Sequence, residues 1–209
     1  YRLMKEIAHR LGLELVPVIS TWDSLIPGLL ADKYDMISEC MDITPDRQKK
    51  VAFANGWLES GGVVVVRKDS NINDLEDLKS AVLGVLHTST WEKEASRYSP
   101  KEIKYYKGEL QALMDLSIGR IDAVITDSIN ARQFMKETKK DLRILDPMIL
   151  KVQKGWALKP GKPVLLNAVN RVFDEIVTDG TYEEITRKFL EFNPFPSHQI
   201  KTLETYLEK

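Results

Sequence analysis

The sequence predicts an α/β protein in which helices cover a mixed or parallel sheet and the chain divides into two lobes. Apolar residues with helical spacing alternate with short strand-like apolar runs along most of the chain, as is typical of such sheets. Two β/α segments flank Gly61-Gly62, and a third begins near Gly155. Because glycine tolerates backbone conformations that other residues avoid, these positions suit strands that cross between lobes. We therefore expect two lobes joined by two crossings.

The first part of the chain is predicted to contain two helices and two strands. Apolar residues recur at helical spacing over 3–11, and Gly12 marks the end of that helix. Residues 13–19 are predicted to form a strand, a second helix is expected over 23–30, and a second strand over 34–38.

Strands and helices continue to alternate after residue 62. Strands are expected at 63–67, 82–86, 123–125 and 156–158. Helices are expected at 73–78, 91–98, 110–118, 128–139, 164–177 and 182–192. The last segment, 200–207, is weakly amphipathic.

The composition excludes several classes of protein. Hydrophobic residues make up 43% of the chain and charged residues 29%, as in ordinary globular proteins. Thirty Lys+Arg face thirty-one Asp+Glu, so the net charge of -1 argues against a sequence-independent nucleic-acid partner. The longest candidate for a membrane span, Val63–Val66, falls far short of the roughly 18 apolar residues that a span needs.

Metal and catalytic motifs are not found in the sequence. The histidines His9, His87 and His198 lie far apart, whereas a metal site needs several converging ligands. The single cysteine, Cys40, excludes an internal disulfide, and without an activating signature it is expected to be a buried structural thiol. Neither a nucleophile elbow, a phosphate loop nor a dinucleotide fingerprint is present, so no metal, cofactor or catalytic residue is predicted.

Three polar features follow predicted strands, where open α/β sheets bind ligands. Arg47 could grip a carboxylate, the turn 87–90 precedes a helix and could bind an anion, and Asp127 could hold an ammonium group. Each also has a structural explanation when taken alone: a surface ion pair for Arg47, and helix caps for the turn and for Asp127. Together the three features suit a zwitterion.

Five segments in order resemble one family: Trp22–Pro27, Lys33–Asp35, Met41–Arg47, Gly119–Val124 and Asp179–Tyr182. The chain resembles, over nearly its whole length, the type II extracellular solute-binding proteins of family 3, the receptors of ABC importers for polar amino acids. The resemblance implies the two-lobed venus-flytrap fold of type II periplasmic binding proteins, with a ligand in the interlobe cleft. It also implies that the lobes close on the ligand.

The resemblance also implies a set of ligand-binding residues. Arg47 falls on the position that binds the ligand's carboxylate in this family. The turn at 89–90 falls on a second segment that holds the same carboxylate, and Asp127 falls on the position that binds the ammonium. The positions matched are Trp22, Glu39, Cys40, Asp42, Arg47, Ser89, Thr90 and Asp127. Two carboxylates, Glu39 and Asp42, favour a cationic ligand such as arginine or lysine, because a cation between them would relieve their repulsion. If either carboxylate turns to a local lysine, glutamine would fit as well.

The resemblance further implies how the chain is divided and where it works. Lobe 1 is expected to comprise 1–58 and 156–209, lobe 2 to comprise 63–150, and the crossings to lie at 59–62 and 151–155. A monomer is expected in the periplasm or outside the cell, compatible with a lipid anchor. Its partners are expected to be a small amino acid and the membrane permease of an ABC importer.

Two other functions and one missing element also follow from the resemblance. The same fold serves as the outer sensor of membrane receptor kinases, in which case residues 200–209 would begin a connector. Some relatives resemble cyclohexadienyl (arogenate or prephenate) dehydratases, where Glu39 would act as a general acid if it were desolvated. Trp91 is bulkier than usual at its position and could stack on the ligand. One amino-terminal strand of lobe 1 is expected before Tyr1.

Overall fold

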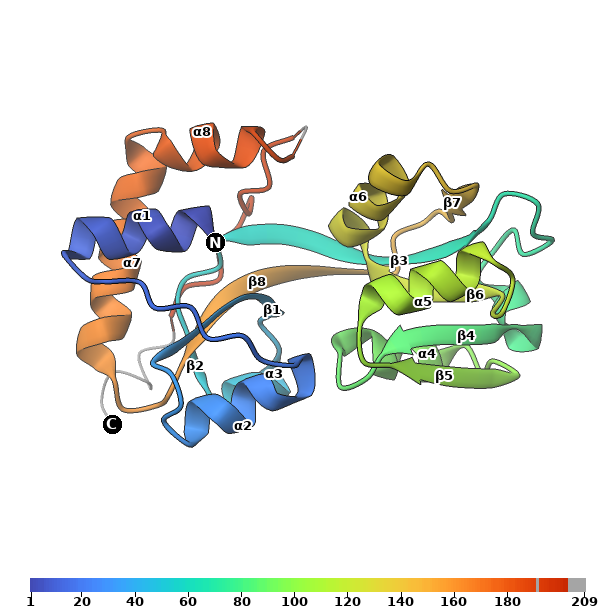
Figure 1. Cartoon of the computed structure of the whole chain (residues 1–209), viewed down its shortest axis with the longest axis horizontal. Coiled ribbons are helices and arrows are strands. Elements are labelled where there is room, and N and C mark those ends of the chain that lie inside the picture. Colours follow the sequence, from blue (N-terminus) through green and yellow to red (C-terminus); the bar gives the residue numbers. More distant parts are fainter. Residues whose placement is uncertain (191, 203–209) are drawn as a thin grey trace. The chain divides into compact units, whose positions relative to one another are not determined.

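The computed structural model describes residues 1–190 and 192–202, and these divide into two compact units. Unit 1 comprises Tyr1–Ser20, Ser24–Glu59 and the chain from Gln153 onward, and unit 2 comprises Thr21–Asp23 and Ser60–Val152. Two long strands, β3 (Leu58–Arg67) and β8 (Leu150–Leu158), contribute residues to both units (Figure 1). The predicted amphipathic segment and the possible connector both begin at residue 200. Their residues from 203 onward lie outside the described residues.

Unit 1 is built from a small antiparallel sheet with helices packed beside it. Strand β8 pairs antiparallel with β1 and with β2, and α1, α7 and α8 contact one another (Figure 1). The elements of unit 1 besides β8 are α1 (Arg2–Leu11), α2 (Leu25–Leu30), β1 (Met36–Asp42), α3 (Pro45–Gln48), β2 (Ala52–Phe53), α7 (Pro163–Thr178) and α8 (Thr181–Arg187). A short 3-10 helix, η1 (Trp22–Ser24), precedes α2, and its first two residues belong to unit 2.

The structure confirms the helix that was predicted over 3–11. Leu3, Met4 and Ile7 are buried on one face of α1. Gly12 follows the helix with φ 66°, a left-handed conformation that favours glycine, and its N–H bonds back to the last turn.

An aromatic cluster forms the centre of unit 1. The Trp156 ring stacks on Trp57 at a centroid distance of 5.3 Å and meets the edge of Phe173 at 5.2 Å. The Tyr182 hydroxyl donates to the Trp57 carbonyl oxygen at 2.7 Å, and burial raises the pKa of Tyr182 above its ordinary value. Residues 57 and 156 are thereby tied to α7 and α8.

The predicted strand over 13–19 is wrong. These residues belong to no strand, and Val16 and Ile19 are 70% and 99% exposed. A strand needs a neighbour to pair with its backbone groups, and no described strand pairs with this segment. The apolar composition of this segment alone therefore could not decide its structure.

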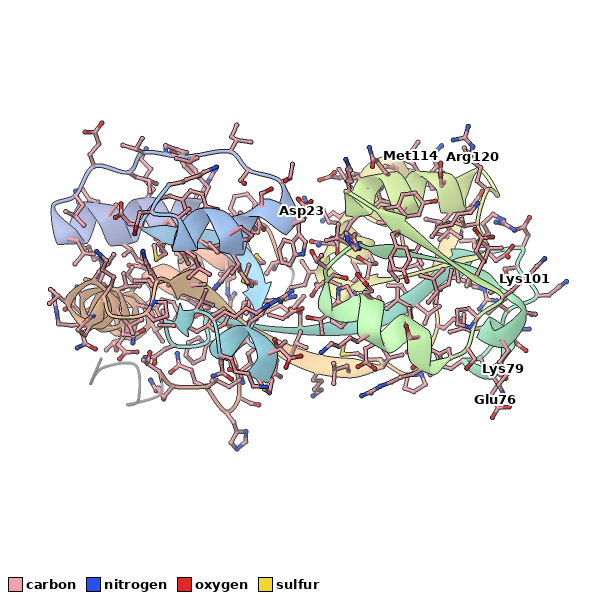
Figure 2. All side chains as sticks on the ribbon, turned by 90° about the horizontal axis from the view of Figure 1, so that it is seen from below. Asp23, Glu76, Lys79, Lys101, Met114 and Arg120 are labelled. Atoms are coloured by element: carbon pink, nitrogen blue, oxygen red, sulfur yellow. The ribbon has the colours of Figure 1, made fainter. Side chains whose placement is uncertain are left out.

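Unit 2 contains a sheet with helices on both faces. Strand β4 pairs parallel with β5 and β6, while β3 pairs antiparallel with β6 and β7. Charged side chains such as Glu76, Lys79 and Lys101 point outward from this unit (Figure 2). The elements are η2 (Glu76–Ser80), β4 (Val82–Leu86), α4 (Thr90–Arg97), β5 (Glu102–Tyr106), α5 (Glu109–Ser117), β6 (Ala123–Asp127), α6 (Ser128–Thr138) and β7 (Leu142–Ile144).

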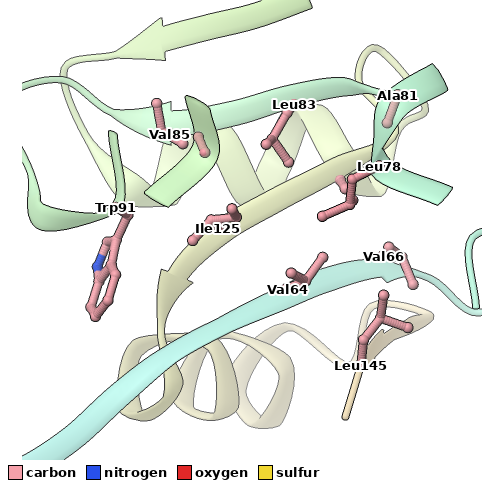
Figure 3. Close-up of a cluster of buried hydrophobic side chains, with 11 residues drawn as sticks. Val64, Val66, Leu78, Ala81, Leu83, Val85, Trp91, Ile125 and Leu145 are labelled. Atoms are coloured by element: carbon pink, nitrogen blue, oxygen red, sulfur yellow. The ribbon is translucent and has the colours of Figure 1, made fainter. Parts of the chain in front are cut away.

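Alternation along β3 supplies both cores of unit 2. Val64 and Val66 join a cluster that includes Trp91 of α4 (Figure 3), whereas Val63 and Val65 join a cluster with residues of α5 and α6. Burial on both faces explains why Val63–Val66 of β3 form a continuous apolar run in the sequence. Strands β2, β5 and β7 and the short helix α3 were not predicted.

Candidate functional site

The turn from β1 into α3 fixes the backbone around Arg47. Thr44 caps α3, because its hydroxyl oxygen accepts from the Arg47 N–H at 3.3 Å, and Pro45 occupies the first helical position, where its missing N–H costs nothing. The Arg47 side chain then folds back, so that its Nη1 donates to the main-chain oxygen of Asp42 at 3.1 Å. The local sequence Thr-Pro-Asp-Arg thus presents a fixed guanidinium at the end of a strand.

Arg47 and Asp42 belong to a buried charged cluster in unit 1. Lys154 Nζ donates a hydrogen bond to Asp42 Oδ1, and Arg47 Nη1 lies 3.8 Å from Asp42 Oδ2. The side chains of Arg47, Asp42 and Lys154 are only 12%, 5% and 6% exposed. Burial lowers the pKa of Arg47, and the Asp42 carboxylate opposes that change. An arginine in this setting keeps its charge and can bind an anion.

Glu39 and Cys40 lie in an irregular part of β1. The pairing of β1 with β8 shifts between Ile37 and Met41, and both Glu39 and Cys40 are exposed. Glu39 Oε1 accepts from the Cys40 N–H at 3.0 Å. The expectation of a buried Cys40 is therefore wrong, because the residue is exposed in this irregular part of the strand. Exposure also gives Glu39 none of the desolvation that a general acid would need.

In unit 2, the start of α4 carries a buried hydroxyl. Ser89 precedes the helix, and its Oγ is buried with no hydrogen-bond partner among the described residues. Thr88 adopts φ 60°, and its N–H donates to Glu92 Oε2 at 2.7 Å. Thr90 begins α4, where helix geometry directs backbone N–H groups outward. A buried hydroxyl at a helix start suits a ligand oxygen with negative charge.

Asp127 ends β6 with both carboxylate oxygens held. Its Oδ1 accepts from the Ile129 N–H at 2.9 Å, which makes Asp127 the cap of α6. Its Oδ2 accepts from Ser60 Oγ at 2.6 Å, and the residue is only 4% exposed. The cap considered from the sequence is thus present. Each carboxylate oxygen can accept a further bond, so capping is compatible with binding an ammonium.

Comparison with known proteins decides the family. The model for bacterial extracellular solute-binding proteins, family 3, matches residues 1–192. The chain belongs to this family. It is 33% identical over 204 residues to the histidine-binding periplasmic protein of Escherichia coli K12, covering 92% of this chain and 78% of that protein. It is 32% identical over 191 residues to ABC transporter arginine-binding protein 1 of the same strain, covering 88% and 77%.

A solved structure confirms the fold of this family-3 member. A mutant of ArgBP from T. maritima matches with a TM-score of 0.86 and 37% identity, covering 91% of this chain and 84% of that one. The fold class and the family resemblance predicted from the sequence are therefore confirmed. The relatives named here are binding proteins rather than enzymes, which confirms the non-enzymatic prediction.

Two tryptophans of the family-3 chain differ in their surroundings. Trp22 is half-buried in η1, whereas Trp91 is 2% exposed and belongs to a core cluster of unit 2. Packing in this core favours a structural role for Trp91 over stacking on a ligand. A Cβ at Gly62 would lie 2.5 Å from Trp91 Cζ3, so glycine at 62 is needed for this close approach.

Lys154 and Ser60 were missed by sequence reasoning. Asp42 and Lys154 are direct partners in the β1–β8 register, a relationship that is invisible until the strands pair. The available signal was a charged residue immediately before the buried run Gly155–Leu158. Ser60 likewise gives only a weak signal, a small polar residue just before Gly61-Gly62 in β3.

Other kinds of site find no support in the part of the chain that the structure describes. Residues 1–190 and 192–202 contain no group of three or more His, Cys, Asp or Glu side chains that could hold a metal ion. Within those same ranges, no helix has the length and apolar character needed to cross a membrane.

Proposed function

We propose that this family-3 protein binds a free α-amino acid outside the cytoplasm and delivers it to an ABC importer. The names of the periplasmic histidine- and arginine-binding relatives support amino-acid binding and an extracytoplasmic location. The observation that carries the proposal is the buried, backbone-anchored guanidinium of Arg47 at a strand end. A guanidinium can bind a carboxylate through two parallel hydrogen bonds, which an ammonium cannot do.

The proposed roles follow the chemistry of each group. Arg47 binds the ligand's α-carboxylate, and the Ser89 hydroxyl with the backbone at Thr90 adds hydrogen bonds to the same group. Asp127 accepts from the α-ammonium while it still caps α6. These four assignments are supported by burial of Ser89 and Asp127, which makes every bond to a ligand stronger than at an exposed surface.

The side-chain preference is proposed to favour cationic amino acids. Arginine- and histidine-binding relatives support it, as does the exposed carboxylate of Glu39. Asp42 contributes less to this preference than its sequence position suggests, because Lys154 already holds its Oδ1. Trp22 is proposed as an apolar wall and Cys40 as a side-chain contact.

A ligand screen tests the proposal. Free L-arginine, L-lysine, L-histidine, L-glutamine and L-glutamate are added separately, and the melting temperature of the protein is recorded. A ligand that binds only the folded state raises that temperature, by an amount that grows with its concentration over Kd. We expect a rise with at least one amino acid and the largest with a cationic one. If no amino acid raises the melting temperature, the proposed function is wrong.

Calorimetry then tests the source of the preference. Glu39→Gln should reduce the ratio of arginine to glutamine affinity by about fivefold or more, since one charge contact is lost. Glu76→Gln, which changes an exposed carboxylate on η2, is the control and should leave the ratio unchanged (Figure 2). Size-exclusion chromatography with light scattering tests the predicted monomer.

A further inference from the structure

Lys154 is a buried cation in β8, and like Arg47 of α3 it approaches the carboxylate of Asp42. Its side chain is 6% exposed, and its Nζ donates to Asp42 Oδ1. Lysine is almost never this buried unless it is paired, since moving an ammonium out of water is costly. Lys154 and Asp42 are register partners of β8 and β1, so the strand pairing itself holds their side chains together.

Lys154 and Arg47 share one carboxylate, but not equally. Lys154 bonds directly to Oδ1, whereas the closest approach of Arg47 Nη1 to Oδ2 is 3.8 Å, beyond hydrogen-bond distance. The direct bond from Arg47 goes instead to the main-chain oxygen of Asp42, at 3.1 Å. The carboxylate is thus drawn toward Lys154, and the guanidinium is oriented by the backbone.

We propose that Lys154 is a positioning residue for the carboxylate subsite. By holding the Asp42 carboxylate, Lys154 prevents it from closing onto the Arg47 guanidinium, where it would compete with the carboxylate of a ligand. This inference rests on the proposed function, because it assumes that Arg47 binds an α-carboxylate. It adds a residue that does not itself touch the ligand.

Removing the Lys154 ammonium should change how Asp42 pairs with Arg47. In Lys154→Met, the buried Asp42 carboxylate loses the ammonium that bonds directly to its Oδ1, and it should form a close, two-bond pair with Arg47. A ligand carboxylate must then displace Asp42. A ligand whose α-carboxylate is replaced by a neutral amide should lose much less affinity, because the amide has no negative charge to interact with the guanidinium.

The experiment measures that carboxylate preference directly. Calorimetry gives Kd for L-arginine and L-argininamide, and for L-glutamine and its α-amide, and the amide-to-acid ratio of Kd is the readout. In Lys154→Met the ratio should fall about tenfold, while a merely structural role would weaken acid and amide alike. Lys151→Met, an exposed lysine in the same strand, is the matched control and should leave the ratio unchanged.

A second substitution tests the route through Asp42. Asp42→Asn removes the competing charge, so the double variant Asp42→Asn with Lys154→Met should recover the wild-type ratio to within about twofold. Should Lys154→Met fail to fold, Lys154→Gln can fill the space and still donate to Asp42, and its ratio should fall by a smaller factor. An unchanged ratio in the folded Lys154 variants, or no recovery in the double variant, overturns the proposal. Failure of wild type to bind any amino acid would instead overturn the proposed function.

Discussion

Ser60 Oγ donates a 2.6 Å hydrogen bond to Asp127 Oδ2 where β3 runs beside β6. The bond joins two residues 67 positions apart. It leaves Asp127 Oδ1 to accept from the Ile129 N–H in the first turn of α6. One carboxylate thereby ties together two strands and a helix.

Removing the Ser60 hydroxyl should destabilise the protein. Ser60→Ala leaves Asp127 buried with one donor fewer, which should lower the free energy of unfolding by about 1–3 kcal/mol. Urea unfolding followed by circular dichroism measures the change. Ser96→Ala, which removes an exposed hydroxyl from α4, should cost much less, and equal losses in the two variants would contradict the assigned role of Ser60.

Asp127→Asn separates helix capping from ligand binding. Asparagine is as good a cap as aspartate, and its amide N–H can donate to the Ser60 oxygen in place of the bond that Oδ2 accepts, so the free energy of unfolding should change little. The negative charge proposed to meet the ligand's ammonium is lost, however, and binding should weaken by about 2–5 kcal/mol. Calorimetry with the best amino acid decides between the roles. Wild-type affinity in this variant would leave Asp127 as a cap alone.

Gly62→Ala should destabilise unit 2 by overpacking. The added methyl group would meet the Trp91 ring at 2.5 Å, and the buried indole has little room to move. We expect a loss of about 1–3 kcal/mol in the free energy of unfolding. Gly108→Ala is the matched control, because nothing lies within 4 Å of its Cβ position. A Gly62 variant as stable as the Gly108 variant would show that the ring repacks without cost.

The Asp179 carboxyl should contribute stability only above acid pH. Hydrogen bonds from Thr181 and from Arg10 lower the pKa of Asp179 to about 2. The folded state therefore holds this proton less tightly than the unfolded chain, whose ordinary pKa is about 3.9. The contribution is complete above about pH 4 and disappears as the pH falls toward 2. The gap in unfolding free energy between wild type and Asp179→Asn should shrink in that window, and a gap constant from pH 2 to 6 would refute this.

How much the sequence could predict depended on how far apart the interacting residues lie. The helix α1 and its end at Gly12 follow from local signals, and the structure confirms them. Residues 13–19 have an equally clear pattern, yet a strand also needs a partner, which local sequence does not supply. The pairing of Lys154 with Asp42, 112 positions apart in the sequence, likewise depends on the register of β8 with β1.

The candidate site was predictable in part for a different reason. Arg47, Ser89 and Asp127 could each be explained as an ion pair or a cap, and the family resemblance was needed to group them. The structure adds what pattern matching could not supply: a buried Ser89 hydroxyl, a doubly held Asp127 and a lysine on Asp42. The lysine matters most, because its bond to Asp42 is the basis of our proposal that Asp42 supports Arg47 rather than contacting the ligand.

Calorimetry on Arg47→Ala, with the amino acid that binds wild type most tightly, tests the central claim most directly. Arg47→Lys is measured beside it, because it keeps the charge and loses the planar fork. Arg120→Ala, an exposed arginine beyond α5 (Figure 2), is the control. If Arg47 holds the α-carboxylate, Arg47→Ala should weaken binding by about 2–5 kcal/mol, Arg47→Lys by less, and Arg120→Ala not measurably. Wild-type affinity in a folded Arg47→Ala variant would contradict the account.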